Sequence, residues 1–250
     1  MRILLINPNT TEGLTERLAG AARSVAAHGT TLECSTARTG VPYITTRSEA
    51  LIGGVSVLET LAERHQDFDA AIVAAFGDPG LGAARELFDI PVVGLAEAGM
   101  LTACMLGGRF SIVTFAQALG PWYKECVAWH RLESRCAGVR MLHGSFRSIS
   151  DVQEEKESLL VDLAKRAVSE DDADVIVLAG APLAGLASKV RDRIPVPVVD
   201  CAEAAMKQAE TLAALRTRGP ECGSFHRPAP KSSTGLYPAL AARIAHAPGV

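Results

Sequence analysis

Unbroken apolar stretches of strand length recur along the chain, and turn residues follow each of the longer ones. Residues 3–6 form the first stretch, which leads into a turn at residues 7–10 and then into apolar positions at helical spacing. The other stretches are residues 70–75, 91–94, 110–114, 175–179 and 196–200. Because apolar strands that alternate with helices are typical of a buried parallel sheet, the pattern predicts an α/β fold.

An internal repeat sharpens this prediction. Residues 69–98 and 174–204 share one plan of strand, turn, helix and second strand, and residues 90–98 align with 196–204 without a gap. We therefore predict two pseudo-symmetric domains with parallel-rich sheets flanked by helices, the first formed by residues 1–97 plus 205–250 and the second by 98–204. The alternative is that both segments merely use a common βαβ unit.

Two such halves predict a site between them, because ligands of open parallel sheets bind beyond the carboxyl ends of the strands. The 250 residues carry a formal net charge of -3, with no basic stripe that would favour nucleic acid or an anionic membrane surface. We expect a small-molecule partner and leave a homo-oligomer open. The first apolar run is too short for a signal-peptide core, so a cytoplasmic protein is expected.

The six cysteines are scattered, with no C-x-x-C pair, and are interpreted as reduced thiols. Cys126 and Cys222 each have a histidine four residues later, His130 and His226. A structural zinc site needs four converging ligands, so we predict no metal site. We also predict no cofactor.

Three motifs together resemble the hydantoin racemase branch of the aspartate/glutamate racemase superfamily: residues 4–10, 76–81 and 198–200. The likeness extends to about Ala214. It implies two pseudo-symmetric α/β domains, an active site between them and cofactor-independent chemistry. It also implies a pair of cysteines, one from each half, that face opposite sides of the acidic carbon of the substrate. Inversion through a planar carbanion needs such an acid and base.

This chain departs from that pattern at both cysteine positions, where it has Ala75 and Gly180. Neither side chain can carry a proton. The absence of both cysteines, together with a different sequence in the turn after residue 179, favours a divergent subfamily over an engineered substitution. The catalytic candidates are therefore these two positions and Asp78, which follows a strand and could act as a base or simply bond backbone amides in its turn.

The candidate substrate-binding residues are Asn7, Thr45, Phe76, Gly77, Thr114 and Ala181. Asn7 could orient a carboxylate or imide or could help to cap the following helix, and the resemblance favours binding. The Thr114 hydroxyl could meet the ligand or cap the next segment of the chain.

Other polar and aromatic candidates have structural alternatives that we favour. Cys201 could approach the site, but a buried thiol near a strand end is the plainer interpretation. Trp122 and Tyr123 could form an aromatic wall or pack beneath a loop. Glu97 and Glu203 occupy equivalent repeat positions at predicted helix starts and are interpreted as structural.

The sequence thus predicts a racemase or isomerase that acts on a small carbonyl compound by proton transfer at an acidic carbon, with both cysteines of the family replaced. The alternatives are a lyase or decarboxylase that works through an enolate, and a non-catalytic small-molecule binding protein.

Overall fold

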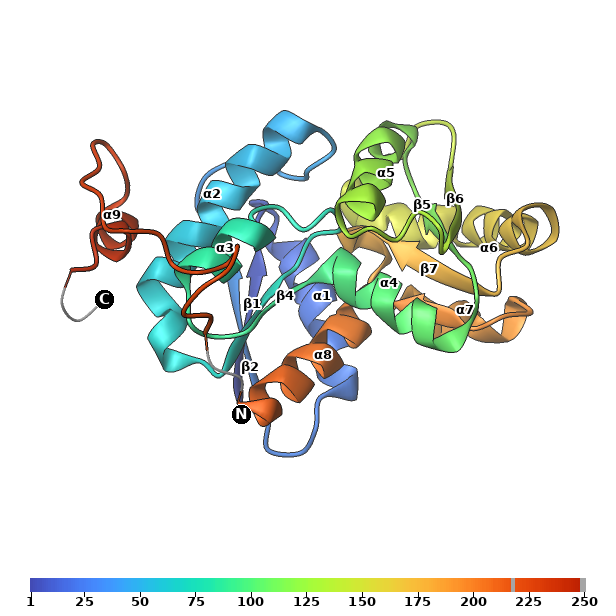
Figure 1. Ribbon diagram of the computed structural model, residues 1–250. Coiled ribbons are helices and arrows are strands. Elements are labelled where there is room, and N and C mark those ends of the chain that lie inside the picture. The colour runs from blue at the N-terminus through green and yellow to red at the C-terminus, as the bar shows by residue number, and fades with distance from the viewer. Residues whose placement is uncertain (217–218, 248–250) are drawn as a thin grey trace.

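The computed structural model describes residues 1–216 and 219–247 and contains two four-stranded parallel sheets with the same strand order (Figure 1). The first sheet has the order β2-β1-β3-β4 and the second the order β6-β5-β7-β8. The strands are β1 (Arg2–Asn7), β2 (Thr31–Thr36), β3 (Ala70–Val73), β4 (Val92–Gly94), β5 (Phe110–Thr114), β6 (Cys136–Met141), β7 (Val175–Ala179) and β8 (Val198–Asp200). The predicted α/β fold with two similar halves is confirmed.

Helices cover both sheets. They are α1 (Glu12–Val25), α2 (Arg47–Arg64), α3 (Leu81–Leu87), α4 (Leu95–Leu106), α5 (Gly120–Trp129), α6 (Val152–Asp171), α7 (Leu186–Val190), α8 (Cys201–Leu215) and α9 (Pro238–Ile244). Short 3-10 turns span His65–Asp67, Gln117–Leu119, Ile149–Asp151, Ala181–Leu183 and Arg191–Arg193. No helix in the described part of the chain is both long and apolar enough to cross a membrane.

The apolar stretches of the sequence form the inner strands β1, β3, β5 and β7 and the edge strands β4 and β8. β3, β5 and β7 are buried along their whole length, and β1 is buried after its first residue. β2 and β6 are edge strands with mostly half-buried residues, and the apolar pattern did not predict them. Each inner strand therefore presents apolar side chains to helices on both faces of its sheet.

The chain returns to the first half after β8. α8 packs against α1 and α4, and it also contacts β3 and β4 of the first sheet. The two boundaries predicted for the domains lie in α4 and α8, and these two helices contact each other. The division into 1–97 plus 205–250 and 98–204 stays a prediction.

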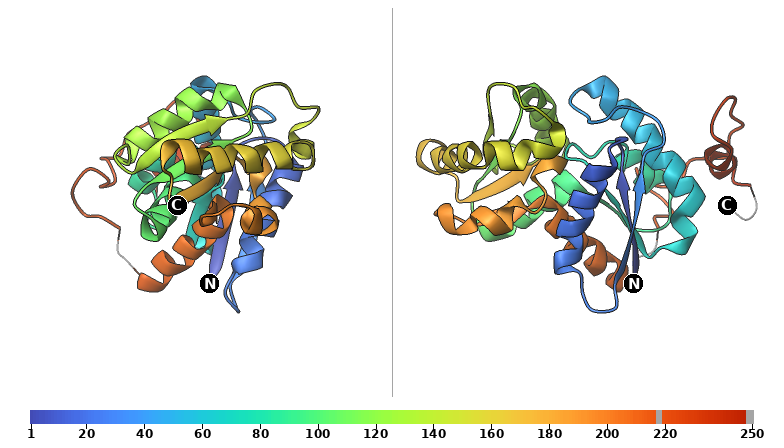
Figure 2. Two further views of the ribbon diagram at one scale, coloured as in Figure 1. Left: turned by 90° about the vertical axis from the view of Figure 1, so that its right-hand side faces the viewer. Right: turned by 180° about the vertical axis from the view of Figure 1, so that it is seen from behind.

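The C-terminal segment adds α9 to the outer side of the first half, away from the second half (Figure 2). Leu240 is buried against the smaller core formed around Phe88, and α9 packs on α2. Arg243 donates hydrogen bonds to the backbone oxygen of Leu87 and to Asp89. These contacts attach the segment to the first half.

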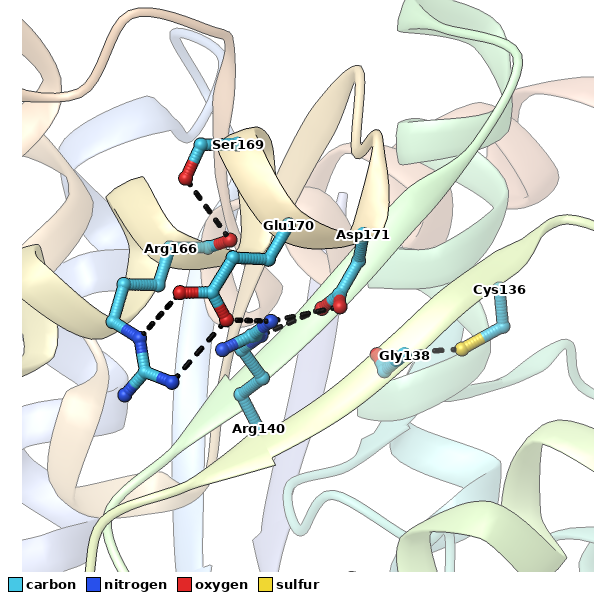
Figure 3. A network of polar contacts seen from close by, with 7 residues as sticks. All are labelled: Cys136, Gly138, Arg140, Arg166, Ser169, Glu170 and Asp171. Atoms are coloured by element: carbon cyan, nitrogen blue, oxygen red, sulfur yellow. Dashed lines mark hydrogen bonds and ion pairs between the residues drawn. The ribbon is translucent and has the colours of Figure 1, made fainter.

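A network of ion pairs ties the edge strand β6 to α6 in the second half (Figure 3). The Arg140 guanidinium lies 2.6 Å from Asp171 and 2.7 Å from Glu170, and Arg166 pairs with the same Glu170 at 2.8 Å. The Arg140 side chain is largely buried. Its guanidinium, paired with both carboxylates, anchors the edge strand β6, which has β5 as its only neighbour in the sheet.

Candidate functional site

A small cavity lies between the two halves, at the carboxyl ends of β3 and β7. Its volume is about 30 Å³, enough for one or two water molecules. Ala75 from the turn after β3 and Gly180 from the turn after β7 both line it. The complete lining is Asn9, Leu14, Tyr43, Ile44, Ala75, Phe76, Phe115, Trp122, Tyr123, Ile149, Gly180, Ala181 and Pro182. The structure therefore brings together the two positions at which the resemblance expects cysteines.

Gly180 has a backbone conformation and surroundings that disfavour a larger residue. Its φ is 112°, which L side chains rarely adopt, and a Cβ there would lie 2.7 Å from the Phe115 ring. The same Cβ would lie 3.4 Å from the Tyr123 hydroxyl. An aromatic ring and a phenol thus occupy the space next to residue 180.

Aromatic side chains from both halves cover the cavity. The ring centroids of Tyr43 and Phe146 lie 6.3 Å apart, and those of Phe115 and Phe146 lie 5.7 Å apart, both edge to face. Below them, Phe76 packs on Tyr123 with 4.5 Å between centroids. These edge-to-face and tilted ring pairs pack the two halves together around the cavity.

None of the described residues that line the cavity carries a charged side chain. Burial raises the pKa of Tyr123 far above its usual value, and its hydroxyl is hydrogen-bonded with Thr114. Tyr123 is therefore a neutral phenol at physiological pH, able to donate a hydrogen bond but not to remove a proton.

Asp78 does not line this cavity. Its oxygens accept hydrogen bonds from the backbone N–H groups of Ala96 at 2.8 Å and Glu97 at 2.9 Å, at the start of α4. Its Oδ2 also lies 3.0 Å from Nε2 of His130. The carboxylate thus bonds backbone amides, but those of α4 rather than those of its own turn, as the structural alternative had expected. Asp78 lines a separate groove of about 550 Å³ between α3 and α5.

An ion network extends from Asp78 through His130. The second ring nitrogen of His130 lies 3.6 Å from Glu97, which also pairs with Arg85. Burial opposes the charged imidazole, but hydrogen bonds to Asp78 and Glu97 outweigh it and raise the pKa of His130 to about 9. Burial likewise opposes ionised Glu97, yet His130 and Arg85 lower its pKa to about 2.

Three predicted binding residues have local hydrogen bonds and lie outside the cavity lining. Asn7 donates to Asn9 Oδ1, to the Thr11 backbone oxygen and to Thr15, and so holds the loop that starts α1. Thr45 donates to Glu49, and Thr114 donates to the Ala179 backbone oxygen at 2.8 Å. Phe76 and Ala181 do line the cavity.

Gly77 lines the groove rather than the cavity, and a Cβ there would lie 2.2 Å from the Trp122 ring. Its small size allows Trp122 of the second half to pack against the turn after β3. Trp122 borders both the groove and the cavity. Trp122 and Tyr123 thus supply an aromatic wall of the cavity, the interpretation that the sequence did not favour.

Cys201 is fully buried, and its thiol donates to the Leu178 backbone oxygen at 3.3 Å. Burial raises the pKa of this thiol well above its usual value, so it remains protonated. It is a structural side chain at the start of α8. His226 is exposed in the C-terminal segment.

Two lining residues had weak or absent sequence signals. Asn9 lies in the same motif as Asn7, residues 4–10, but only Asn7 was predicted to bind the ligand. Ile149 comes from a 3-10 turn after a long connection, where no apolar period points to the site. Both reach the cavity through tertiary packing.

Comparison with known proteins agrees with the geometry. The family model for Asp/Glu/Hydantoin racemase matches residues 3–209. A hydantoin racemase from Paenarthrobacter aurescens is 35% identical over 92% of this chain and 99% of its own length, and one from Pseudomonas sp. (strain NS671) is 32% identical over 94% and 95%. The structure of allantoin racemase from Klebsiella pneumoniae matches with 36% identity and a TM-score of 0.90, covering 96% of this chain and 98% of that one. The chain therefore belongs to the Asp/Glu/Hydantoin racemase family, in its hydantoin racemase branch.

Proposed function

We propose that this chain binds a cyclic ureide of the hydantoin or allantoin type between its two halves and promotes proton exchange at the acidic carbon of the ring, as a racemase-type isomerase. The observation that carries the proposal is that Ala75 and Gly180, from equivalent turns of the two halves, line one cavity. An uncharged, aromatic lining suits a neutral ring better than an amino-acid zwitterion.

Hydrogen-bond donors are available where the enolate charge would develop. The Tyr123 hydroxyl, next to the Gly180 position, would turn its proton from Thr114 to a ring carbonyl oxygen, and the Asn9 amide would bind a second polar group of the ring. A neutral phenol with a raised pKa stabilises an enolate as a donor.

The proton itself would pass to and from water. Since Ala75 and Gly180 carry no titratable group, a water molecule beside either face would remove the proton from the acidic carbon, and another would return one to the opposite face. We expect a slow reaction, because a positioned acid or base contributes typically about 10²–10⁴-fold.

The absence of a proton carrier at both positions favours a second candidate function, ureide binding without turnover. One experiment separates the two. Each enantiomer of a 5-substituted hydantoin and of allantoin is incubated with the protein in D₂O, while NMR follows deuterium at the acidic carbon and polarimetry follows optical rotation. Protein-free samples give the spontaneous rate, and calorimetry measures binding.

Exchange above the spontaneous rate with loss of rotation supports the isomerase, and Tyr123→Phe should reduce it by about tenfold or more. Binding without exchange supports the second candidate. A product of changed mass indicates a lyase and contradicts the proposal, as does the absence of both binding and exchange.

A further inference from the structure

A second cluster of chemically active side chains lies outside the cavity, beside the groove between α3 and α5. Asp78, Cys126 and His130 each offer one ligand atom, and these atoms lie within 4.8 Å of one another. Asp78 and Cys126 line the groove, which has a volume of about 550 Å³. The cluster is independent of the proposed ureide site.

Its three members come from two halves of the molecule. Asp78 follows β3 of the first half, whereas Cys126 and His130 lie one helical turn apart at the end of α5 in the second half. Residues four apart on a helix share one face, so the thiol and the imidazole approach Asp78 together. The side chains of Asp78 and His130 are 1% and 5% exposed, and Cys126 is buried.

The surroundings of the imidazole match those of a metal ligand. Its Nε2 lies 3.0 Å from Asp78 Oδ2, and its Nδ1 lies 3.6 Å from Glu97, which Arg85 holds in place. A carboxylate behind the histidine is the usual partner of a metal-bound imidazole, since it fixes the ring orientation. The Gly77 backbone N–H is hydrogen-bonded to the Cys126 sulfur, an arrangement that also suits a thiolate.

The same contacts argue against a nucleophilic cysteine. Both ring nitrogens of His130 face carboxylates, so neither is directed at the thiol as a base. Asp78 Oδ2 accepts from the Glu97 backbone N–H at 2.9 Å and retains capacity for one further partner, which in the metal-free protein is the His130 proton.

We propose that Asp78, Cys126 and His130 form a binding site for a divalent cation of the zinc class. The cation replaces the proton between Asp78 and His130 and the proton of the Cys126 thiol, and a water molecule from the groove completes four-coordination. One thiolate, one imidazole and one carboxylate are ligands that Zn²⁺ accepts, at about 2.0–2.3 Å, and the ligand atoms need to converge slightly from their present separations. The bound cation joins the two halves.

The test uses the reduced full-length protein after chelator treatment, titrated with Co²⁺ and separately dialysed against Zn²⁺. We expect one metal per chain and a near-ultraviolet thiolate-to-cobalt charge-transfer band. Zn²⁺ should also raise the melting temperature, because it binds the folded state. Glu97→Gln should weaken binding by roughly 10- to 100-fold, the usual effect of losing the carboxylate behind a ligating histidine.

Cys126→Ser should abolish the band and His130→Gln should weaken binding, while Cys136→Ser, a half-buried cysteine outside the cluster, should leave both unchanged. Far-ultraviolet circular dichroism verifies that each variant folds. Wild-type protein that shows no band and binds no Zn²⁺ at micromolar concentrations overturns the proposal, whether or not the variants fold. A band that persists in Cys126→Ser overturns it equally.

Discussion

At the scale of single residues, the ring of Phe115 and the absence of a side chain at residue 180 depend on each other. A Cβ on Gly180 would lie 2.7 Å from the Phe115 ring, and the φ of 112° disfavours any L side chain. Gly180→Cys should therefore lower the free energy of unfolding by about 1–3 kcal/mol through backbone strain, with overpacking in addition. Denaturant unfolding measures the loss.

Ala75→Cys is the matched control, because residue 75 already carries a Cβ in the same cavity; we expect a change below about 1 kcal/mol. Measured against Phe115→Ala alone, the addition of Gly180→Cys should cost only the backbone strain, because the ring that overpacks the new side chain is gone. A Gly180→Cys protein as stable as the wild type would show that Phe115 does not constrain this position.

The same residues show what sequence could predict of the site. The resemblance located Ala75 and Gly180, and the structure places both on one cavity. It also favoured Asn7 as a ligand-binding residue, whereas the structure directs its amide to Asn9, Thr11 and Thr15. Asn7, at the end of β1, and Asn9, in the loop that follows, offer identical chemistry, and only tertiary structure decides which one faces the cavity.

At the scale of elements, the two halves cap equivalent helices with carboxylates from different positions. In the second half Asp200 caps α8 itself, accepting from the backbone N–H groups of Ala202 and Glu203. In the first half the equivalent residue is Gly94, and Asp78 reaches over from the turn after β3 to cap α4. A Cβ on Gly94 would lie 2.4–2.7 Å from the Asp78 carboxyl atoms.

Gly94 already has the backbone conformation of a capping aspartate. Its φ and ψ are -84° and 143°, against -88° and 125° for Asp200. We predict that Gly94→Asp and Asp78→Gly each destabilise the protein, but that the double variant loses at least about 1 kcal/mol less than their sum, because the new carboxylate fits the space that Asp78 leaves. Denaturant unfolding of the four proteins measures the coupling.

Gly94→Asp combined with Asp200→Gly is the control, since these residues share no hydrogen-bond partner in the described chain and their effects should add. If the losses in free energy of unfolding simply add in the Gly94→Asp/Asp78→Gly double variant, a carboxylate at residue 94 does not replace that of Asp78 as the cap of α4, and the prediction is wrong.

Sequence patterns predicted the inner strands and the edge strands β4 and β8, but not the edge strands β2 and β6. The inner strands are buried on both faces and therefore appear as continuous apolar runs, which predicted their order along the chain. β2 and β6 carry polar residues such as Glu33 and Arg140 on half-exposed faces, so they lack that signal. Their pairing with β1 and β5 depends on neighbours distant in sequence.

At the scale of the whole molecule, His130 links the two halves by charge. It lies at the end of α5 in the second half and faces Asp78 and Glu97 of the first. In the metal-free protein, the pKa of about 9 exceeds the ordinary 6.5, so the folded state holds the imidazolium proton more tightly than the unfolded state. This contribution to stability is complete below pH 6.5 and is lost as the pH rises through 9.

The difference between the two pKa values corresponds to at most about 3 kcal/mol. With chelator present, we predict that the stability advantage of wild type over His130→Gln shrinks by up to that amount between pH 6.5 and pH 9.5, as measured by urea unfolding at closely spaced pH values. Glu97, with a pKa of about 2, stays ionised throughout, so the change reports on the imidazole.

His28→Gln, the same substitution at an exposed histidine outside this network, provides the control. If the His130→Gln and wild-type curves run parallel, the imidazole is not held charged between the halves. The expected result is that the stability difference between wild type and His130→Gln declines only as the pH becomes alkaline. The two halves are then joined most firmly when the imidazole is protonated, with Asp78 and Glu97 as its two anionic partners.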